Sequence, residues 1–149
     1  MHSMVSLLAV ALLVGCGSGD DQADADAATA TMAGPTLADF AGTWQNTAML
    51  EGTPDPVPST MTGSGDSSEW SMSLADRPDI RLAVTVVGDS LIAQSEEYES
   101  ILRDGVMVSI RLASALHGDT MEGKLVATYR TPEGEQVVRG TTTGMRAPM

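Results

Sequence analysis

From Leu37 onward the chain is divided into short segments in which apolar and polar residues alternate. Turn signals such as Gly88-Asp89, Asp104-Gly105 and Gly118-Asp119 separate these segments, at intervals of roughly 8 to 14 residues. Strict alternation puts apolar side chains on one face of a strand, because successive Cβ atoms point to opposite faces. Short strands at this spacing predict an all-β sandwich or barrel.

The clearest predicted strand is 79–87, in which Ile80, Leu82, Val84 and Val86 share one face. Tight turns between successive segments predict an antiparallel up-and-down meander of about eight or nine strands. Closure into a small barrel would remove the two unpaired edges, so we expect a closed barrel, with an open sandwich or partly closed sheet as the alternative. The predicted strands are 41–50, 60–63, 69–74, 79–87, 90–97, 98–103, 106–116, 120–130 and 136–146, with a helical turn at 37–40 and a Pro-rich loop or edge at 53–58.

Aromatic residues make up only 3% of the chain, so Met, Val, Leu and Ile must fill most of a barrel interior. Several small residues lie within the predicted strands. They would either leave room inside the barrel for one small ligand or reflect close packing of the sheet, and the sequence leaves both readings open. These residues are Ala83, Ala93, Ala113, Ala127, Gly123 and Gly140.

The N-terminus carries a short apolar run from Met4 to Val14, which ends just before Cys16, the single cysteine of the chain. A run of about 11 residues is well below the roughly 20 that cross a bilayer as a helix, so a cleaved leader at 1–15 is predicted. His2 stands where a Lys or Arg usually precedes such a run. An ordinary secretory leader and a buried core cysteine are the alternatives.

The residues Leu13, Val14, Gly15 and Cys16 resemble the lipobox of bacterial lipoprotein signal peptides. The resemblance implies that Cys16 is the first mature residue and carries a thioether-linked diacylglycerol, commonly with an added N-acyl chain. Two or more acyl chains give stable anchoring, so the expected partner is a membrane and the expected location the cell envelope. Gly17, in place of the Asp that retains Gram-negative lipoproteins at the inner membrane, favours the periplasmic face of the outer membrane.

Residues 16–36 are predicted to be the lipidated cysteine and a flexible acidic linker, followed by a β-barrel domain at 37–149. The linker is rich in Gly, Ala, Asp and Thr and has too little apolar surface to offset the entropy of ordering it. Its aspartates do not follow the spacing of a calcium-binding loop, so a solvated spacer is expected.

The two ends of the predicted meander carry a further pattern. Gly42 and Trp44 lie in the first predicted strand, and Arg146 ends the last, so closure would bring them together and let Arg146 cover the Trp44 ring. This pattern resembles the calycin superfamily of lipocalin-like barrels, in which Gly-x-Trp on the first strand is covered by an Arg near the last. The alternative is that Trp44 is an ordinary core aromatic residue.

Composition and motifs narrow the function classes. A formal net charge of -12 argues against nucleic acid, and with one Cys and two His we expect no metal site of the His/Cys type and no cofactor. His117 lies at a turn with no nucleophile motif, and the acidic group Glu96, Glu97 and Glu99 is expected to be solvated, so we expect no enzymatic activity. Two hypotheses remain, a barrel that binds a small apolar molecule and a filled barrel that contacts an envelope partner.

Overall fold

The computed structural model describes residues 33–149, of which Gly34–Met149 form one compact unit. The predicted leader at 1–15, nearly all of the predicted linker, and the lipobox residues Leu13, Val14, Gly15 and Cys16 lie outside the described residues.

The described unit is almost entirely β-structure, as the alternation predicts. One short helix, α2 (Leu37–Phe40), precedes the first strand at the place where a helical turn is predicted. The strands are β1 (Gly42–Leu50), β2 (Val57–Gly63), β3 (Ser71–Ser73), β4 (Ile80–Val87), β5 (Ser90–Ser95), β6 (Tyr98–Glu99), β7 (Met107–His117), β8 (Thr120–Thr131) and β9 (Gly134–Arg146).

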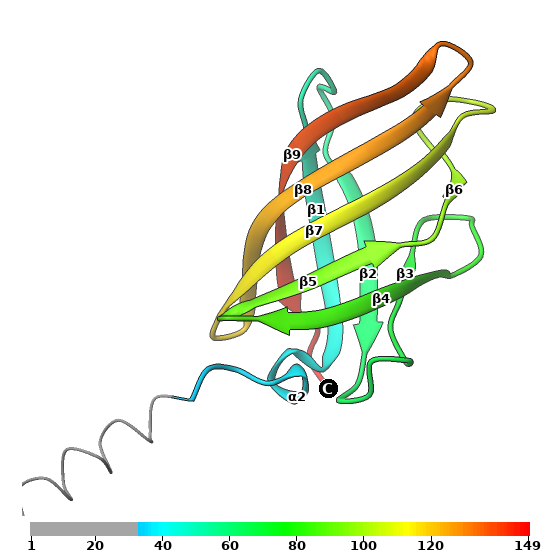
Figure 1. Ribbon diagram of the computed structural model, residues 1–149. Coiled ribbons are helices and arrows are strands. Elements are labelled where there is room, and N and C mark those ends of the chain that lie inside the picture. Colours follow the sequence, from blue (N-terminus) through cyan, green and yellow to red (C-terminus); the bar gives the residue numbers. More distant parts are fainter. Residues whose placement is uncertain (1–32) are drawn as a thin grey trace, which may run out of the picture. The chain divides into compact units, whose positions relative to one another are not determined.

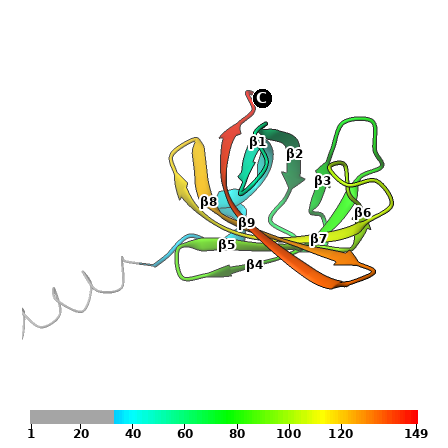
Figure 2. The same ribbon diagram turned by 90° about the horizontal axis from the view of Figure 1, so that it is seen from above.

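The strands form a closed antiparallel meander, which confirms the predicted fold class (Figures 1 and 2). Successive strands pair in order from β1 to β5, β7 pairs with β8, and β8 pairs with β9. Two further pairings complete the ring: β1 pairs with β9, and β5 pairs with β7. Eight strands therefore make the barrel, and the two-residue β6 is an addition that pairs only with β7.

The two ends of the barrel differ, and we name them here. Because neighbouring strands are antiparallel, α2 and the turns 64–70, 88–89 and 118–119 gather at one end, which we call the closed end (Figure 1). The loops 51–56, 74–79, 100–106 and 132–133 gather at the other end, which we call the mouth.

The core is densest toward the closed end. The side chains of Phe40, Trp44 and Leu91 have no solvent exposure, and Met61 and Trp70 have 1% each. Along β4 the predicted alternation is observed: Ile80 and Leu82 are buried, Val84 and Val86 are partly buried, and the residues that alternate with them are exposed. Five large side chains thus fill the closed end of the barrel.

Two features of the strands differ from the predicted boundaries, each for a physical reason. Pro58 lies inside β2, opposite Thr47 of β1, but β3 pairs with β2 only from Thr60 onward. Pro58 therefore has a neighbouring strand on one side only. A proline is tolerated at such an edge position, because it has no backbone N–H to donate to a second strand. The predicted strand 98–103 is shortened to β6, because the Ser100 hydroxyl accepts hydrogen bonds from the backbone of the next loop.

The small residues mainly serve close packing of the strands. A Cβ on Gly123 would lie 2.1 Å from the carbonyl oxygen of Ala113, and one on Gly140 would lie 2.2 Å from that of Met49. Glycine is therefore needed where β7, β8, β9 and β1 approach and curve around the barrel. Ala113 and Ala83 face outward, so of the predicted set only Ala93 and Ala127 are buried alanines.

Candidate functional site

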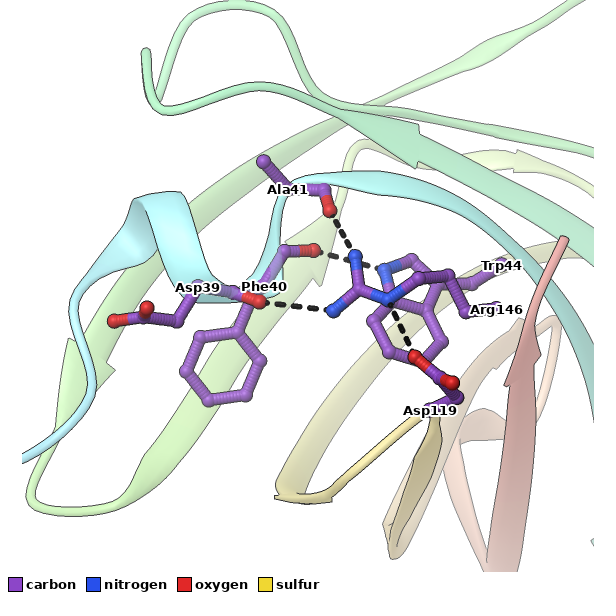
Figure 3. Close-up of polar contacts among 6 residues, drawn as sticks. All are labelled: Asp39, Phe40, Ala41, Trp44, Asp119 and Arg146. Atoms are coloured by element: carbon purple, nitrogen blue, oxygen red, sulfur yellow. Dashed lines mark hydrogen bonds and ion pairs between the residues drawn. The ribbon is translucent and has the colours of Figure 1, made fainter. Parts of the chain in front are cut away.

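The closed end is sealed by Trp44. Its side chain is fully buried, and its indole Nε1 donates a hydrogen bond of 2.8 Å to the carbonyl oxygen of Phe40. The Arg146 guanidinium lies over the indole ring, with Cζ 4.3 Å from the ring centroid (Figure 3). This stacking follows from closure of the barrel, because Trp44 and Arg146 are directly opposite in the β1–β9 ladder. A cation in this position interacts favourably with the electron-rich ring face.

Arg146 also satisfies the end of helix α2. A helix of four residues cannot bond its own last carbonyl groups, which need partners elsewhere. Arg146 Nη2 donates to the carbonyl oxygen of Asp39 at 3.0 Å, and Nη1 donates to that of Ala41 (Figure 3). Together with the Trp44 bond to Phe40, three successive carbonyls are paired. The stacked pair therefore fixes the segment that covers the closed end.

Gly42 is required for this arrangement. Its φ is +132°, a backbone conformation that residues with a Cβ rarely adopt. A Cβ at this position would also lie 2.9 Å from Arg146 Nη1. The structure thus brings together the three residues singled out in the sequence, Gly42, Trp44 and Arg146.

Two acidic residues of the closed end were not singled out in the sequence. Asp119, in the turn between β7 and β8, places Oδ1 3.4 Å from Arg146 Nε, and its carbonyl accepts the Arg146 backbone N–H at 2.8 Å. Asp39 accepts hydrogen bonds from the Thr36 backbone N–H and hydroxyl, and these two bonds lower the pKa of the Asp39 carboxyl. The spacing Thr36-x-x-Asp39 is the sequence signal for this cap.

A cavity that is partly open to solvent lies in the barrel interior at the mouth. It has a volume of about 50 Å³, room for a few water-sized groups, since one water needs about 10–15 Å³ on this measure. Its walls are mainly apolar, with two phenol rings and two serines. The lining residues are Ala48, Leu50, Val57, Ser59, Met72, Leu74, Tyr98, Ser100, Ile101, Leu102, Val108, Ile110, Leu125, Ala127 and Tyr129.

The loop 100–106 covers this cavity. Ile101 and Leu102 line the cavity, yet they remain 39% and 41% exposed, so they sit at its entrance. The buried Ser100 hydroxyl accepts the backbone N–H groups of Leu102 and Arg103, at 3.0 and 3.1 Å. The Ser100 N–H in turn donates to the carbonyl of Val106 at 2.8 Å. The loop is therefore a bonded turn that holds two apolar side chains over the opening.

Arg103 fastens the loop to the barrel wall. Its Cζ lies 4.1 Å from the centroid of the Tyr129 ring on β8, and its Nη1 donates to Gln136 Oε1 on β9 at 2.7 Å. Tyr98 and Tyr129 both lie opposite Val108 and flank it across β6, β7 and β8. Burial, together with the nearby Tyr129, raises the pKa of the Tyr98 phenol to about 12. Tyr98 is therefore a neutral hydrogen-bond donor at physiological pH.

The remaining sequence candidates lie on the surface. His117 is exposed at the end of β7. Glu97 forms an ion pair of 2.5 Å with Arg130, and both side chains are largely in solvent. Within residues 33–149, no three His, Cys, Asp or Glu side chains group closely enough to hold a metal ion. No helix in this described range has the length and apolar character needed to span a bilayer.

Comparisons with models of protein families, with curated proteins and with solved structures found no match to this chain.

Proposed function

We propose that this chain is a lipid-anchored protein of the cell envelope whose barrel binds a small apolar ligand at the mouth. One observation carries the binding part. A mainly apolar cavity lies at the mouth, beneath a loop whose Ile101 and Leu102 reach both the cavity and the solvent. Ligand sites of barrels lie at their mouths and are apolar with a few polar groups.

The cavity volume limits the size of this ligand. Sites for drug-sized molecules hold roughly 300 Å³ or more, whereas this cavity holds about 50 Å³. The ligand is therefore of the size of a short alkyl group, or it is longer and displaces Ile101 and Leu102 from the entrance. Each methylene that enters the apolar space contributes about 0.8 kcal/mol.

Native mass spectrometry of gently purified full-length protein tests the binding part. We expect an added mass of a small apolar molecule that dissociates on mild activation. A Leu125→Trp variant, which fills the cavity from the β8 wall, should lose the added mass. If neither the unsubstituted protein nor the Leu125→Trp variant carries a bound species, and added 1-hexanol does not bind, the proposed binding function is refuted.

The anchoring part rests on the lipobox resemblance alone and has its own test. Cys16→Ala should move the protein from the membrane fraction to the soluble fraction, because the acyl chains have no other attachment site. Ser18→Ala is a matched control that should leave the protein in the membrane fraction. If the Cys16→Ala protein stays with the membrane, the anchor is not at this cysteine.

A second function, a filled barrel that contacts a protein partner, is favoured by a different observation. The cavity is small, and Ile101, Leu102 and Met107 are each about 40% exposed near the same end. Exposed apolar groups that lie together mark contact surfaces. Photocrosslinking from position 102 in whole cells separates the two functions, because a partner surface gives a discrete protein adduct and a ligand site does not.

A further inference from the structure

Strand β4 extends beyond its neighbour β3 toward the closed end of the barrel (Figure 1). Within residues 33–149, β3 pairs only with Ile80 and Arg81, and the last bond on this side runs from the Leu82 N–H to the Trp70 carbonyl, at 3.0 Å. The residues that follow, 83–87, pair with β5 alone. We call this stretch the open edge of β4.

The backbone groups of Val84 and Val86 point away from β5 along this edge. Because Gly88-Asp89 is a two-residue turn, the flanking pair Val87–Ser90 exchanges both of its backbone hydrogen bonds, and such pairs alternate along an antiparallel ladder. Val84 and Val86 take the alternate positions, as does Leu82, whose N–H bonds on the β3 side. No other backbone group within the described residues bonds to Val84 or Val86 on that side. Their N–H and C=O groups are therefore available to a further strand.

The open edge carries none of the features that usually protect a free strand. Proteins blunt such edges with Pro, with charged residues or with bulges. The stretch of β2 that lacks a β3 partner contains Pro58 and so follows this rule. Residues 83–87 read Ala-Val-Thr-Val-Val, without Pro or charge, and Val87 is 61% exposed. Such β-branched residues favour pairing with another strand.

We propose that the open edge pairs with the same edge of a second copy, antiparallel and about a two-fold axis at Thr85. Val84 of each copy then exchanges backbone hydrogen bonds with Val86 of the other, so that all of the free groups are paired. The pairing ends at Leu82, whose N–H is already bonded within its own chain. None of the residues 83–87 lines the cavity at the mouth, so this contact is independent of the proposed ligand site.

The side chains on the outer face fit the same register. With the axis at Thr85, Ala83 lies opposite Val87 of the other copy, and these positions are uncharged. Arg81 falls opposite Asp89, and both are exposed. Opposite charges that face each other across two strands stabilise their pairing. The net charge of -12 opposes association, but at physiological salt this repulsion is screened beyond about 8 Å, so contacts at the edge decide the affinity.

Disulfide formation tests the contact and its register. The full-length chain with Cys16→Ala is used, so that each introduced cysteine is the only one. Thr85→Cys should form a covalent dimer on oxidation with diamide, because a residue on the axis faces its own copy with Cα atoms about 4.5 Å apart. Ala83→Cys alone should not, because its two copies are at least roughly 13 Å apart. A mixture of Ala83→Cys and Val87→Cys chains should form the mixed dimer.

Sedimentation equilibrium of the chain with Cys16→Ala measures the affinity. A contact of this small area should give a dissociation constant between about 10 μM and 1 mM. Thr85→Lys puts like charges on the axis and should weaken the dimer at least about tenfold, whereas Thr143→Lys, on the exposed face of β9, is the matched control and should not. Arg81→Asp should also weaken it, and adding Asp89→Arg should restore it. The urea midpoint of each variant checks that the barrel is folded.

Three results would overturn the proposal. The first is a chain that stays monomeric at about 1 mM, or a dimer that Thr85→Lys leaves unchanged. The second is an Ala83→Cys chain that cross-links to itself as readily as Thr85→Cys, which would exclude the two-fold axis. The third is a Thr85→Cys chain that cross-links in whole cells to a different protein and not to its own copy, which would assign the open edge to a strand of another partner.

Discussion

Replacement of Arg146 by alanine should destabilise the barrel more than any other surface-accessible charge substitution, because this side chain makes several different contacts at the closed end. The Arg146→Ala variant loses the stacking on Trp44, which contributes about 1 kcal/mol, and the hydrogen bonds to two backbone carbonyls. Hydrogen bonds to charged donors contribute about 1.5–3 kcal/mol each. At the exposed Asp39, water replaces part of the lost hydrogen bond, so the free energy of unfolding should fall by about 3 kcal/mol in total.

This loss is large beside the 5–15 kcal/mol that ordinarily separates folded from unfolded domains, as an order of magnitude. With a urea dependence of roughly 1.5 kcal/mol per molar, the unfolding midpoint should fall by about 2 M. Equilibrium unfolding in urea measures it, and tryptophan fluorescence is a suitable signal because Trp44 and Trp70 are both buried.

Two variants of the same contact set are the controls. Asp119→Asn removes only the ion pair, in which the Asp119 side chain is 89% exposed, and should cost less than about 0.5 kcal/mol. Arg146→Lys keeps the charge but not the planar fork that reaches two carbonyls, so its stability should lie between the other two. If Arg146→Ala lowers the midpoint no further than Asp119→Asn, the stacking on Trp44 and the two carbonyl hydrogen bonds do not stabilise the closed end.

Three further predictions concern other parts of the barrel. Gly63→Ala places a Cβ 2.0 Å from the Trp70 ring and should destabilise by about 1–3 kcal/mol in urea unfolding, whereas Gly65→Ala, with 3.6 Å to its nearest neighbour, should be close to neutral. The folded-state pKa of Tyr98 is raised to about 12, so its contribution to stability is complete below pH 10 and is lost as the pH rises toward 12; Tyr98→Phe should flatten this loss. Arg130→Ala removes an exposed ion pair and should change the unfolding free energy by less than about 1 kcal/mol.

Each of these has an outcome that counts against it. Equal midpoints for the two glycine variants would mean that the Trp70 ring has room to move. An unchanged pH profile in Tyr98→Phe would assign the alkaline loss of stability to other groups. A loss above about 2 kcal/mol in Arg130→Ala would show that the pair is more than a solvated surface contact.

The architecture could be predicted from the sequence because it depends on local signals. Alternation in β4 and turn pairs such as Gly88-Asp89 specify strands and hairpins, and closure of a meander of this length removes its two unpaired edges. The closure could be located as well, since Trp44 and Arg146 sit at the two ends of the meander. Their contact follows from the register alone.

The details of the mouth could not be predicted, because they depend on a loop without periodicity. The loop 100–106 owes its shape to the Ser100 hydroxyl and the Arg103 contact with Tyr129, neither of which leaves a pattern in the sequence. The cavity volume depends on how far each side chain projects inward. Gly123 and Gly140 illustrate this. They are small residues, but they create no space, because the backbones of the neighbouring strands lie directly beside them.

The chain enters and leaves the barrel at the same end. Gly34 lies beside the β4–β5 turn, where a Cβ would be 3.2 Å from the Gly88 carbonyl, and the backbone N–H of Ala147 bonds to Thr43 at the start of β1. A tag, a bead or a surface linked through either of these segments is therefore attached opposite the mouth. Immobilised at Gly34 or after Ala147, the barrel would turn its mouth away from the support, and reporters of binding belong in the loops 51–56 and 132–133.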